Sequence, residues 1–205
     1  MSGEPAVVVA TPGAEPHAAG GYAAAVLLDG WALLGRASLR ASEEALRRWL
    51  NAAALVRPGP EGGSVVVVAD ASLVPVQALV RWDPVAHAER ELAERRELRF
   101  PPAVRLASLT GTEEAVQEVL SAAELPPHAE VLGPVPVAEG APGRGTADAG
   151  RGEEGGRHAT VRMLVRVDRR SGTPLATALR AAQAIRSARK DADVVRLQLD
   201  PAELL

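Results

Sequence analysis

The chain has 205 residues, a formal net charge of −3 and 47% apolar residues, enough for one large or two small domains with a buried core. It has no cysteine, which excludes disulfides and thiolate metal sites, and its four histidines are too scattered for zinc spacing. Aromatic residues make up only 2% of the chain, which argues against a base-stacking surface.

The sequence shows neither a membrane-spanning segment nor a secretion signal. Apolar runs such as residues 65–69 are far shorter than the roughly 20 residues that span a bilayer. The N-terminus has no basic start followed by an apolar signal segment. We therefore expect a cytoplasmic chain with no membrane partner.

The first hundred residues have the pattern of an α/β domain. Continuous apolar runs, each followed by turn or polar residues, predict buried parallel strands at 6–10, 23–28 and 65–69. Between the last two, Ser42 can cap a helix that continues to Ala53.

A short helix at about 73–81 and a charged helix complete this first domain. Asp83 can cap the charged helix and Pro84 fits its first turn, while Pro101 forces Phe100 out of the helical region. We therefore predict a domain over residues 1–100 and a boundary at Pro101-Pro102.

The second domain, residues 101–205, alternates differently. Strands are predicted at about 103–110, 129–133, 159–168 and 194–199, with helices at about 112–123 and 174–189. This β-α-β-β-α-β order is that of the ferredoxin-like fold, an antiparallel sheet with two helices on one face. The whole chain is thus predicted to combine an α/β and an α+β domain. Residues 139–157, rich in Gly, Ala, Pro and charge, are predicted to form a disordered insert.

Charge is strongly segregated along the chain. Residues 157–190 contain nine Arg or Lys and a single acidic residue, Asp168, whereas residues 1–156 contain 13 basic and 21 acidic residues. Such a local surplus suits a phosphate-facing surface, although a solvated helix face gives the same pattern. The candidate nucleic-acid-binding residues are Arg169, Arg170, Arg180, Arg186, Arg189 and Lys190. On the second helix we expect Arg180, Gln183, Ser187 and Lys190 on the solvent side and Leu175, Leu179, Ala182 and Ile185 toward the sheet.

Most other chemistry is disfavoured by the sequence. Asp29 and Asp70 each follow a predicted parallel strand and could share a magnesium ion, but the residues after them favour turn or helix caps, so neither is assigned a role. Lys190, the chain's single lysine, lies near a helix end, so the sequence contains no phosphate-binding P-loop. His87 and His128, beside charged or turn residues, are expected at the surface. We predict no catalytic residue, cofactor or metal site within this chain.

Several motifs resemble one family. The charged helix Glu89-Arg-Glu-Leu-Ala-Glu-Arg-Arg followed by Phe100-Pro-Pro, the stretch Gly21–Asp29, the strand Val65–Ala69, Val131-Leu-Gly-Pro134 and the ending Val195–Pro201 are similar to the C-terminal part of PriA-like primosomal replication-restart proteins, also called primosomal protein N prime. The resemblance covers nearly the whole chain. It implies the latter half of the second helicase lobe followed by a C-terminal domain that resembles a ribosomal S-ten-like fold.

One departure from that family concerns its ATP chemistry. Where its helicases carry Gln-x-x-Gly-Arg-x-Gly-Arg-Gly, this chain has Asn51-Ala-Ala-Ala-Leu-Val-Arg-Pro-Gly59, so Leu55 and Pro58 occupy the arginine positions. Neither side chain can donate a hydrogen bond to a transferring phosphate. The sequence therefore resembles the helicase-degenerate branch of the family found in actinobacteria. Zinc, ATP and magnesium are implied only for the full-length family.

Three functional hypotheses follow. The first is a DNA-binding and primosome-assembly module acting at stalled or branched forks, without helicase activity, whose partners are single-stranded or forked DNA, single-stranded DNA-binding protein and primosome components. The second is the C-terminal half of an active ATP-dependent 3′-to-5′ DNA helicase, completed by an N-terminal part. The third sets the resemblance aside and treats the ferredoxin-like half as a small-molecule regulatory or RNA-binding domain.

Overall fold

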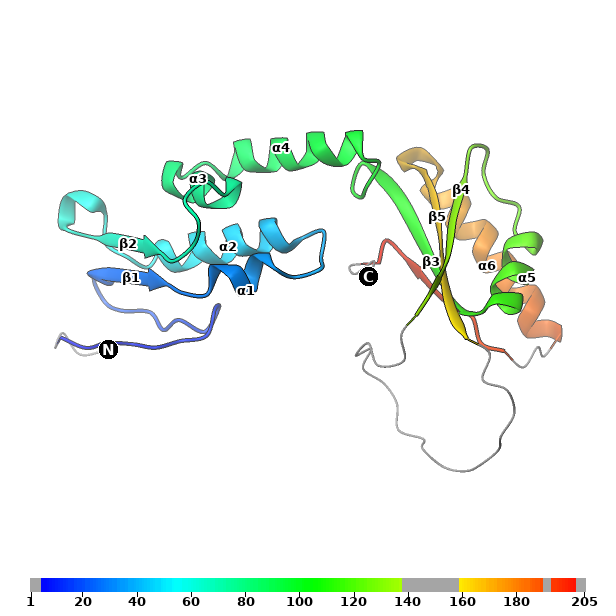
Figure 1. Ribbon diagram of the computed structural model, residues 1–205, viewed down its shortest axis with the longest axis horizontal. Helices are drawn as coiled ribbons and strands as arrows, with labels where there is room; N and C mark the ends of the chain where they lie inside the picture. The colour runs from blue at the N-terminus through cyan, green and yellow to red at the C-terminus, as the bar shows by residue number, and fades with distance from the viewer. Residues whose placement is uncertain (1–4, 138–158, 190–192, 202–205) are drawn as a thin grey trace, which may run out of the picture. The chain divides into compact units, whose positions relative to one another are not determined.

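The computed structural model describes residues 5–137, 159–189 and 193–201 (Figure 1). Its helices and strands show a mixture of α and β structure, as expected from the sequence. The described residues form two compact units, one up to Glu94 and the other from Arg95 on. The insert expected at 139–157 lies outside the described residues.

The first unit contains a parallel two-stranded sheet and its helices. Strand β1 pairs with β2 so that Ala24 lies opposite Ser64 and Leu27 opposite Val67, which confirms the parallel pairing expected from the apolar runs. The elements are β1 (Ala24–Leu27), α1 (Gly30–Leu34), α2 (Ala41–Ala53), the 3-10 helix η1 (Gly59–Glu61), β2 (Ser64–Val67), α3 (Val74–Arg81) and α4 (Pro84–Glu97), whose last residues belong to the second unit.

Two predictions about these strands were wrong. Residues 6–10 form no strand, and both Val7 and Val9 are 94% exposed. The strands β1 and β2 are not fully buried either, since Val26 and Val66 are 59% and 52% exposed. The reason is that alternate strand residues such as Leu27 pack on the helical core, while no described element covers the opposite face.

The core of the first unit lies between the sheet and helices α2 and α3. Leu46 and Trp49 of α2 and Val76 and Leu79 of α3 are each at least 94% buried. The three-residue spacing within each pair places both residues on one face of their helix, and this is the amphipathic pattern that predicted α2.

Helix α1 was not predicted. It is only five residues long, and Asp29 precedes it in a left-handed conformation without a side-chain cap. Gly30 is buried, and a Cβ atom there would lie 2.8 Å from Cβ of Ala69. Glycine therefore lets the start of α1 approach the end of β2 closely.

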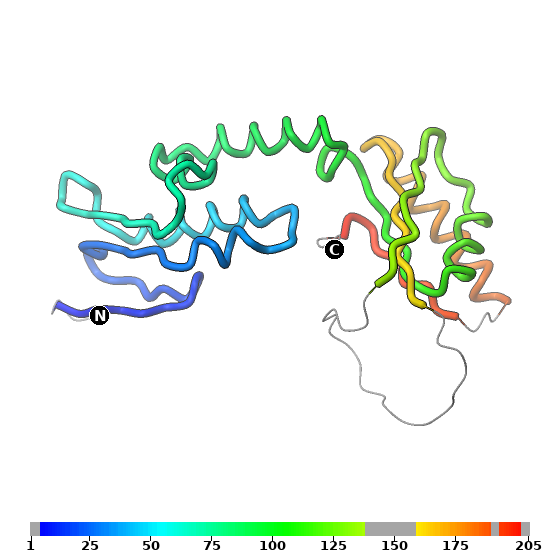
Figure 2. Tube along the Cα trace, in the orientation of Figure 1, coloured from blue at the N-terminus to red at the C-terminus, as the bar shows by residue number. Residues whose placement is uncertain are grey.

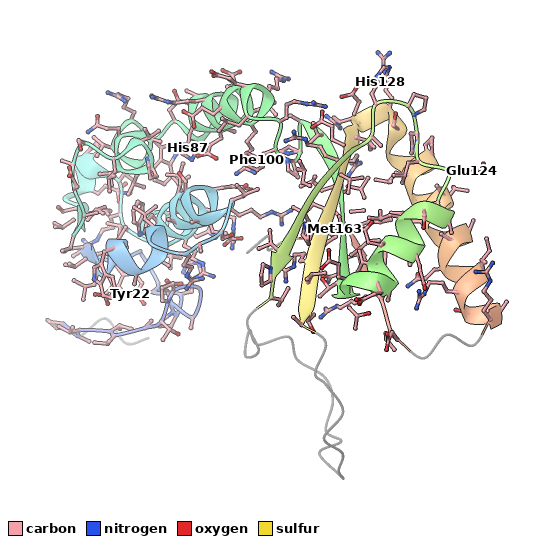
Figure 3. The ribbon with its side chains drawn as sticks, turned by 45° about the vertical axis from the view of Figure 1, so that its right-hand side comes forward. Tyr22, His87, Phe100, Glu124, His128 and Met163 are labelled. Carbon is pink, nitrogen blue, oxygen red and sulfur yellow. The ribbon has the colours of Figure 1, made fainter. Side chains whose placement is uncertain are left out.

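Of the N-caps predicted for α2 and α4, the first was wrong and the second is confirmed. Helix α2 begins at Ala41 without a side-chain cap, and Ser42 Oγ instead lies 3.3 Å from Nε2 of His87. His87, labelled in Figure 3, is 5% exposed rather than at the surface, because its side of α4 packs toward α2. The cap of α4 is as predicted, since the Ala86 N–H donates to Asp83 Oδ1 at 2.9 Å.

The second unit is an antiparallel sheet with two helices. Its elements are β3 (Val104–Thr112), α5 (Glu113–Ala122), β4 (Glu130–Pro136), β5 (Thr160–Asp168), the 3-10 helix η2 (Arg169–Ser171), α6 (Gly172–Arg189) and β6 (Arg196–Leu199). The strand order is β4-β5-β3-β6 and every neighbouring pair is antiparallel. Figure 2 shows β3 and β6, far apart in the sequence, running side by side.

Both helices cover the same face of this sheet (Figure 1). Leu109 of β3 and Val165 of β5 point into a core with Val116 of α5 and Leu179 of α6, and all four are fully buried. Met163, labelled in Figure 3, faces α5, where Gln117 Nε2 lies 3.7 Å from its sulfur. The alternation of buried and exposed residues along β5 leaves the other sheet face to Arg162, Leu164 and Arg166.

The sheet-facing row of α6 differs from the prediction at one position. Ile185 is 45% exposed, whereas Arg186 is 8% exposed and continues the buried row of Leu175, Leu179 and Ala182. The guanidinium of Arg186 forms an ion pair with Glu118 of α5 and donates to the Asp193 carbonyl at 3.0 Å. The four-residue step from Ala182 to Arg186 matches the helical period better than a three-residue step to Ile185, so the arginine continues the row.

No helix in the described part of the chain is long and apolar enough to cross a membrane.

The core of the first unit can be tested with a matched pair of tryptophans. Trp49 is 2% exposed and Trp31 is 78% exposed. We expect Trp49→Ala to lower the opening free energy of first-unit amides by about 3–5 kcal/mol in hydrogen exchange, because it leaves a cavity. Trp31→Ala should change it by less than about 0.5 kcal/mol. Equal effects would contradict the packing described.

The buried arginine gives a second test. Arg186→Ala should destabilise the second unit by about 1–3 kcal/mol in denaturant unfolding, because it removes the buried stem and leaves the Asp193 carbonyl without its donor. The control Arg180→Ala, on the exposed side of the same helix, should stay within about 0.5 kcal/mol of the wild type. A neutral Arg186→Ala would show that the residue is not part of the core.

Candidate nucleic-acid interface

The six residues predicted to bind nucleic acid fall into three groups. Arg169, Arg170, Arg180 and Arg189 are exposed, and within the described ranges none of them forms an ion pair. Arg186 is buried and engaged with α5. Lys190 lies outside the described residues. Four guanidinium groups are therefore available to an external phosphate, whereas that of Arg186 is held inside the unit by its ion pair with Glu118.

The structure does not gather these four arginines into one patch. Arg169 and Arg170 are adjacent in η2, which leads directly into α6. Arg189 is nine positions after Arg180, so the two lie about half a turn apart around the helix and roughly 13 Å apart along it. Arg189 therefore lies on a different side of α6 from Arg180, whereas η2 leads into α6 at the start of the helix. We call Arg169, Arg170 and Arg180 the arginine ridge.

Gln183 does not share the solvent side with Arg180 as predicted. Its Nε2 atom donates to the Val195 carbonyl at 3.0 Å, and the residue is half-buried. Ser187 is exposed as expected. The amide of Gln183 therefore joins α6 to the segment before β6 rather than extending the polar surface.

The charge surplus of residues 157–190 is smaller in the folded unit than in the sequence. Glu118 pairs with Arg186 and Glu130 pairs with Arg166, and both carboxylates come from outside that segment. Asp168, the acidic residue inside the segment, directly precedes Arg169, and its Oδ1 atom lies 3.7 Å from Nη2 of Arg99. The pairing of β4 with β5 places Glu130 beside Arg166, and the packing of α5 on α6 places Glu118 beside Arg186. A count of charges along the sequence cannot show these contacts.

Glu130 is the centre of a network that sequence reasoning missed. It accepts from Arg166 Nε at 3.1 Å and pairs with Arg99 through its other oxygen, while Arg166 Nη1 donates to the Arg99 carbonyl at 3.3 Å. The Arg166 hydrogen bond is the main reason that the pKa of Glu130 is lowered, and Arg99 adds to it. The alternation of Val with Arg162 and Arg166 along β5 was the available signal, since it predicts arginines on the sheet face opposite the helices.

The two aspartates after the parallel strands show no metal site. Asp70 Oδ1 accepts from the Ser72 N–H at 2.8 Å and from its hydroxyl at 2.7 Å, and these bonds lower the Asp70 pKa. Asp29 makes no side-chain cap. Among the described residues no group of three or more His, Asp or Glu side chains could hold a metal ion. Asp70 therefore has the turn role favoured by the sequence, whereas the cap expected of Asp29 is not formed by its side chain.

The segment that departs from the helicase pattern begins in the last turn of α2 and continues beyond the helix. The Leu55 carbonyl accepts from Tyr22 N–H at 2.9 Å, and Arg57 N–H donates to the Tyr22 carbonyl at 3.0 Å. Pro58 comes immediately before η1. The backbone around Leu55 is thus fixed beside the start of β1, and Arg57 is the one position between Leu55 and Gly59 that carries a cationic side chain.

Comparison with known proteins identifies the family of this sequence. The family described as "Primosomal protein N C-terminal domain" matches residues 96–202. A probable replication restart protein PriA from Mycobacterium leprae (strain TN) is 51% identical over 204 residues, which cover 100% of this chain and 30% of that protein. The corresponding protein from Mycobacterium tuberculosis (strain CDC 1551 / Oshkosh) is 50% identical over 209 residues, covering 98% of this chain and 31% of its own length.

The chain thus spans about 30% of the length of these curated relatives. The family match covers the second unit, and the similarity to the mycobacterial proteins extends through the first unit as well. On this basis the chain belongs to the PriA family of replication-restart proteins and corresponds to their C-terminal part.

Proposed function

We propose that this chain is the DNA-binding and primosome-assembly module of a replication-restart protein that acts at stalled or branched forks, without helicase activity of its own. The observation that carries the DNA part is the arginine ridge: three exposed guanidinium groups, none of them in an ion pair within the described residues. Family membership supports the restart role.

The chemistry of the second unit favours contacts to the phosphate backbone over contacts to bases. Arginine keeps its charge at any physiological pH and can hold a phosphate with two parallel hydrogen bonds. Phe100 is the last aromatic residue in the sequence, so the unit offers almost no side chain on which a base could stack. Binding should therefore depend on nucleic-acid shape and charge, with little preference for sequence.

The fold of the second unit supports a finer assignment. Its β-α-β-β-α-β order, the strand order β4-β5-β3-β6 and both helices on one face are features of the ferredoxin-like arrangement that the sequence predicted. We infer a ferredoxin-like domain that resembles the S-ten-like fold. For the first unit, the parallel pairing of β1 and β2 with α2 between them in the sequence supports part of a second helicase lobe.

The absence of helicase activity is inferred from side chains. Leu55 and Pro58 stand where helicases of the family carry arginines, and neither can stabilise the charge on a transferring phosphate. The alternative is an active ATP-dependent 3′-to-5′ helicase, completed by an N-terminal part that would also supply zinc, ATP and magnesium sites. Membership of a helicase-containing family favours that alternative, and the side chains at positions 55 and 58 favour the first proposal.

Assembly partners are proposed from the family. A restart module has to recruit components of the primosome and to act where single-stranded DNA-binding protein coats the DNA. We therefore propose both as partners of the longer protein. The negative charge of the first unit, seven Arg against eleven acidic residues over 1–94, makes it the less suitable of the two units for a general DNA surface.

DNA binding can be tested by removing the arginine ridge. The triple variant Arg169→Gln, Arg170→Gln, Arg180→Gln should bind a fluorescent oligo-dT or forked duplex roughly 10- to 100-fold more weakly at 0.1 M salt, because three phosphate contacts and their released counterions are lost. The slope of log affinity against log salt should fall by about 2 for single-stranded DNA. Fluorescence anisotropy across a salt series measures both quantities.

The matched control is Arg90→Gln, which removes a positive charge from an exposed side chain on α4 that pairs with Glu94 at 3.3 Å. It should leave affinity and slope nearly unchanged. If the wild-type chain does not bind DNA, or if its affinity does not change with salt, the DNA part of the proposal is wrong.

Helicase inactivity has a separate test. A full-length PriA protein that contains this sequence should show no ATP hydrolysis above background when forked DNA is added, because the arginine positions of its second lobe are occupied by Leu55 and Pro58. A steady-state phosphate-release assay measures this, with a PriA protein that retains both arginines as the positive control. Fork-stimulated hydrolysis by the test protein would establish the alternative.

A further inference from the structure

A second cationic feature belongs to the first unit, whereas the arginine ridge belongs to the second. The turn after α1 and the first turns of α2 enclose a cleft of about 390 Å³. Its charged lining residues are Arg36, Arg40, Arg48 and Glu44, and Leu33, Ser38 and Ala45 are among the others. All of these residues lie within the first unit, so the cleft belongs to that unit alone.

The charge of this cleft is opposite to that of its surroundings. The unit carries a net negative charge over residues 1–94, yet three of its seven arginines line this one cleft. Their only acidic neighbour among the lining residues is Glu44. The cleft therefore retains a positive surplus in an acidic unit, which gives a local potential that attracts anions.

Glu44 does not neutralise all of these arginines. Its Oε2 atom pairs with Arg47 at 2.7 Å and with Arg48 at 3.5 Å, and the Arg47 hydrogen bond is the first cause of its lowered pKa. Arg36 and Arg40 are exposed and form no ion pair in the part of the chain that the structure describes. Two guanidinium groups are thus free to reach a ligand, while Arg48 is held in place by Glu44.

The remaining lining suits a compact oxyanion. Ser38 Oγ accepts from Arg40 N–H at 3.2 Å, so its hydroxyl hydrogen is free to point into the cleft. Leu33 and the buried Ala45 form an apolar wall, and a lower dielectric beside it strengthens the attraction between the arginines and an anion. Hydroxyl and guanidinium donors beside an apolar wall are a common set of contacts for a phosphate group.

We infer that the cleft lined by Arg36, Arg40 and Arg48 is a phosphate-binding site of the first unit, separate from the arginine ridge. The ligand is a phosphate ester or phosphate anion. That chemistry occurs in a nucleic-acid backbone and in a nucleotide, and the two sources can be distinguished by experiment. This site does not depend on the DNA-binding proposal for the second unit.

The test uses the full chain, labelled with ¹⁵N, at constant ionic strength maintained with chloride. Inorganic phosphate at millimolar concentration should shift the amide resonances of residues 36–45. Arg40→Gln and Arg36→Gln should each raise the dissociation constant about fivefold or more, because each removes a charge-assisted hydrogen bond. Both side chains are exposed, so the variants should fold normally.

The matched control is Arg81→Gln at the end of α3, an exposed arginine that does not line the cleft, which should bind phosphate like the wild type. No shift at residues 36–45, or an equal weakening in Arg81→Gln, would overturn the inference. The two sources are separated by titrating oligo-dT and a nucleoside triphosphate into a variant that lacks the arginine ridge. Tighter binding of oligo-dT at residues 36–45 assigns the cleft to a nucleic-acid backbone, and tighter binding of the triphosphate assigns it to a nucleotide.

Discussion

The burial of Arg186 against α5 is the interaction on which the surface of the second unit depends. Its ion pair with Glu118 and its bond to the Asp193 carbonyl hold one arginine of α6 inside the domain. Because that arginine completes the sheet-facing row of the helix, the opposite side of α6 is directed to solvent. Arg180 therefore stays exposed, and so do Arg169 and Arg170 in the 3-10 turn before the helix. The same packing thus decides which arginines are structural and which can bind a ligand.

A second pairing has the same effect on the other face of the sheet. Glu130 engages Arg166 and Arg99 at once, so these two guanidinium groups are paired within the protein. Removal of one partner would leave a partly buried charge without compensation, which is why such pairs are costly to break even when they add little net stability. Arg196 of β6 is exposed and forms no ion pair within the described residues, so this face keeps a free guanidinium group as the ridge does.

Much of the secondary structure could be predicted from periodicity, and the partners of individual side chains could not. The two-residue alternation of β5 and the three- and four-residue spacing of α2 and α6 are local properties of the sequence. The buried His87 lies beside Ser42, which is 45 positions away in the sequence. The buried Arg186 pairs with Glu118, which belongs to another helix. The apolar run at residues 6–10 predicted a strand that is not formed, because hydrophobicity alone does not supply a pairing partner. Of the candidate site, the exposed arginines were predictable, whereas the Glu130 network and the cleft at α2 required the fold.

Packing separates the buried Arg186 from the exposed arginines of the ridge, and chemical footprinting tests this separation directly. Phenylglyoxal modifies exposed guanidinium groups, and mass spectrometry of the full chain would measure modification at each arginine with and without single-stranded DNA. Arg169, Arg170 and Arg180 should react in the free chain and be protected by DNA, whereas Arg186 should react slowly in both states. Rapid modification of Arg186 in the free chain, or no protection of the other three by DNA, would contradict the account.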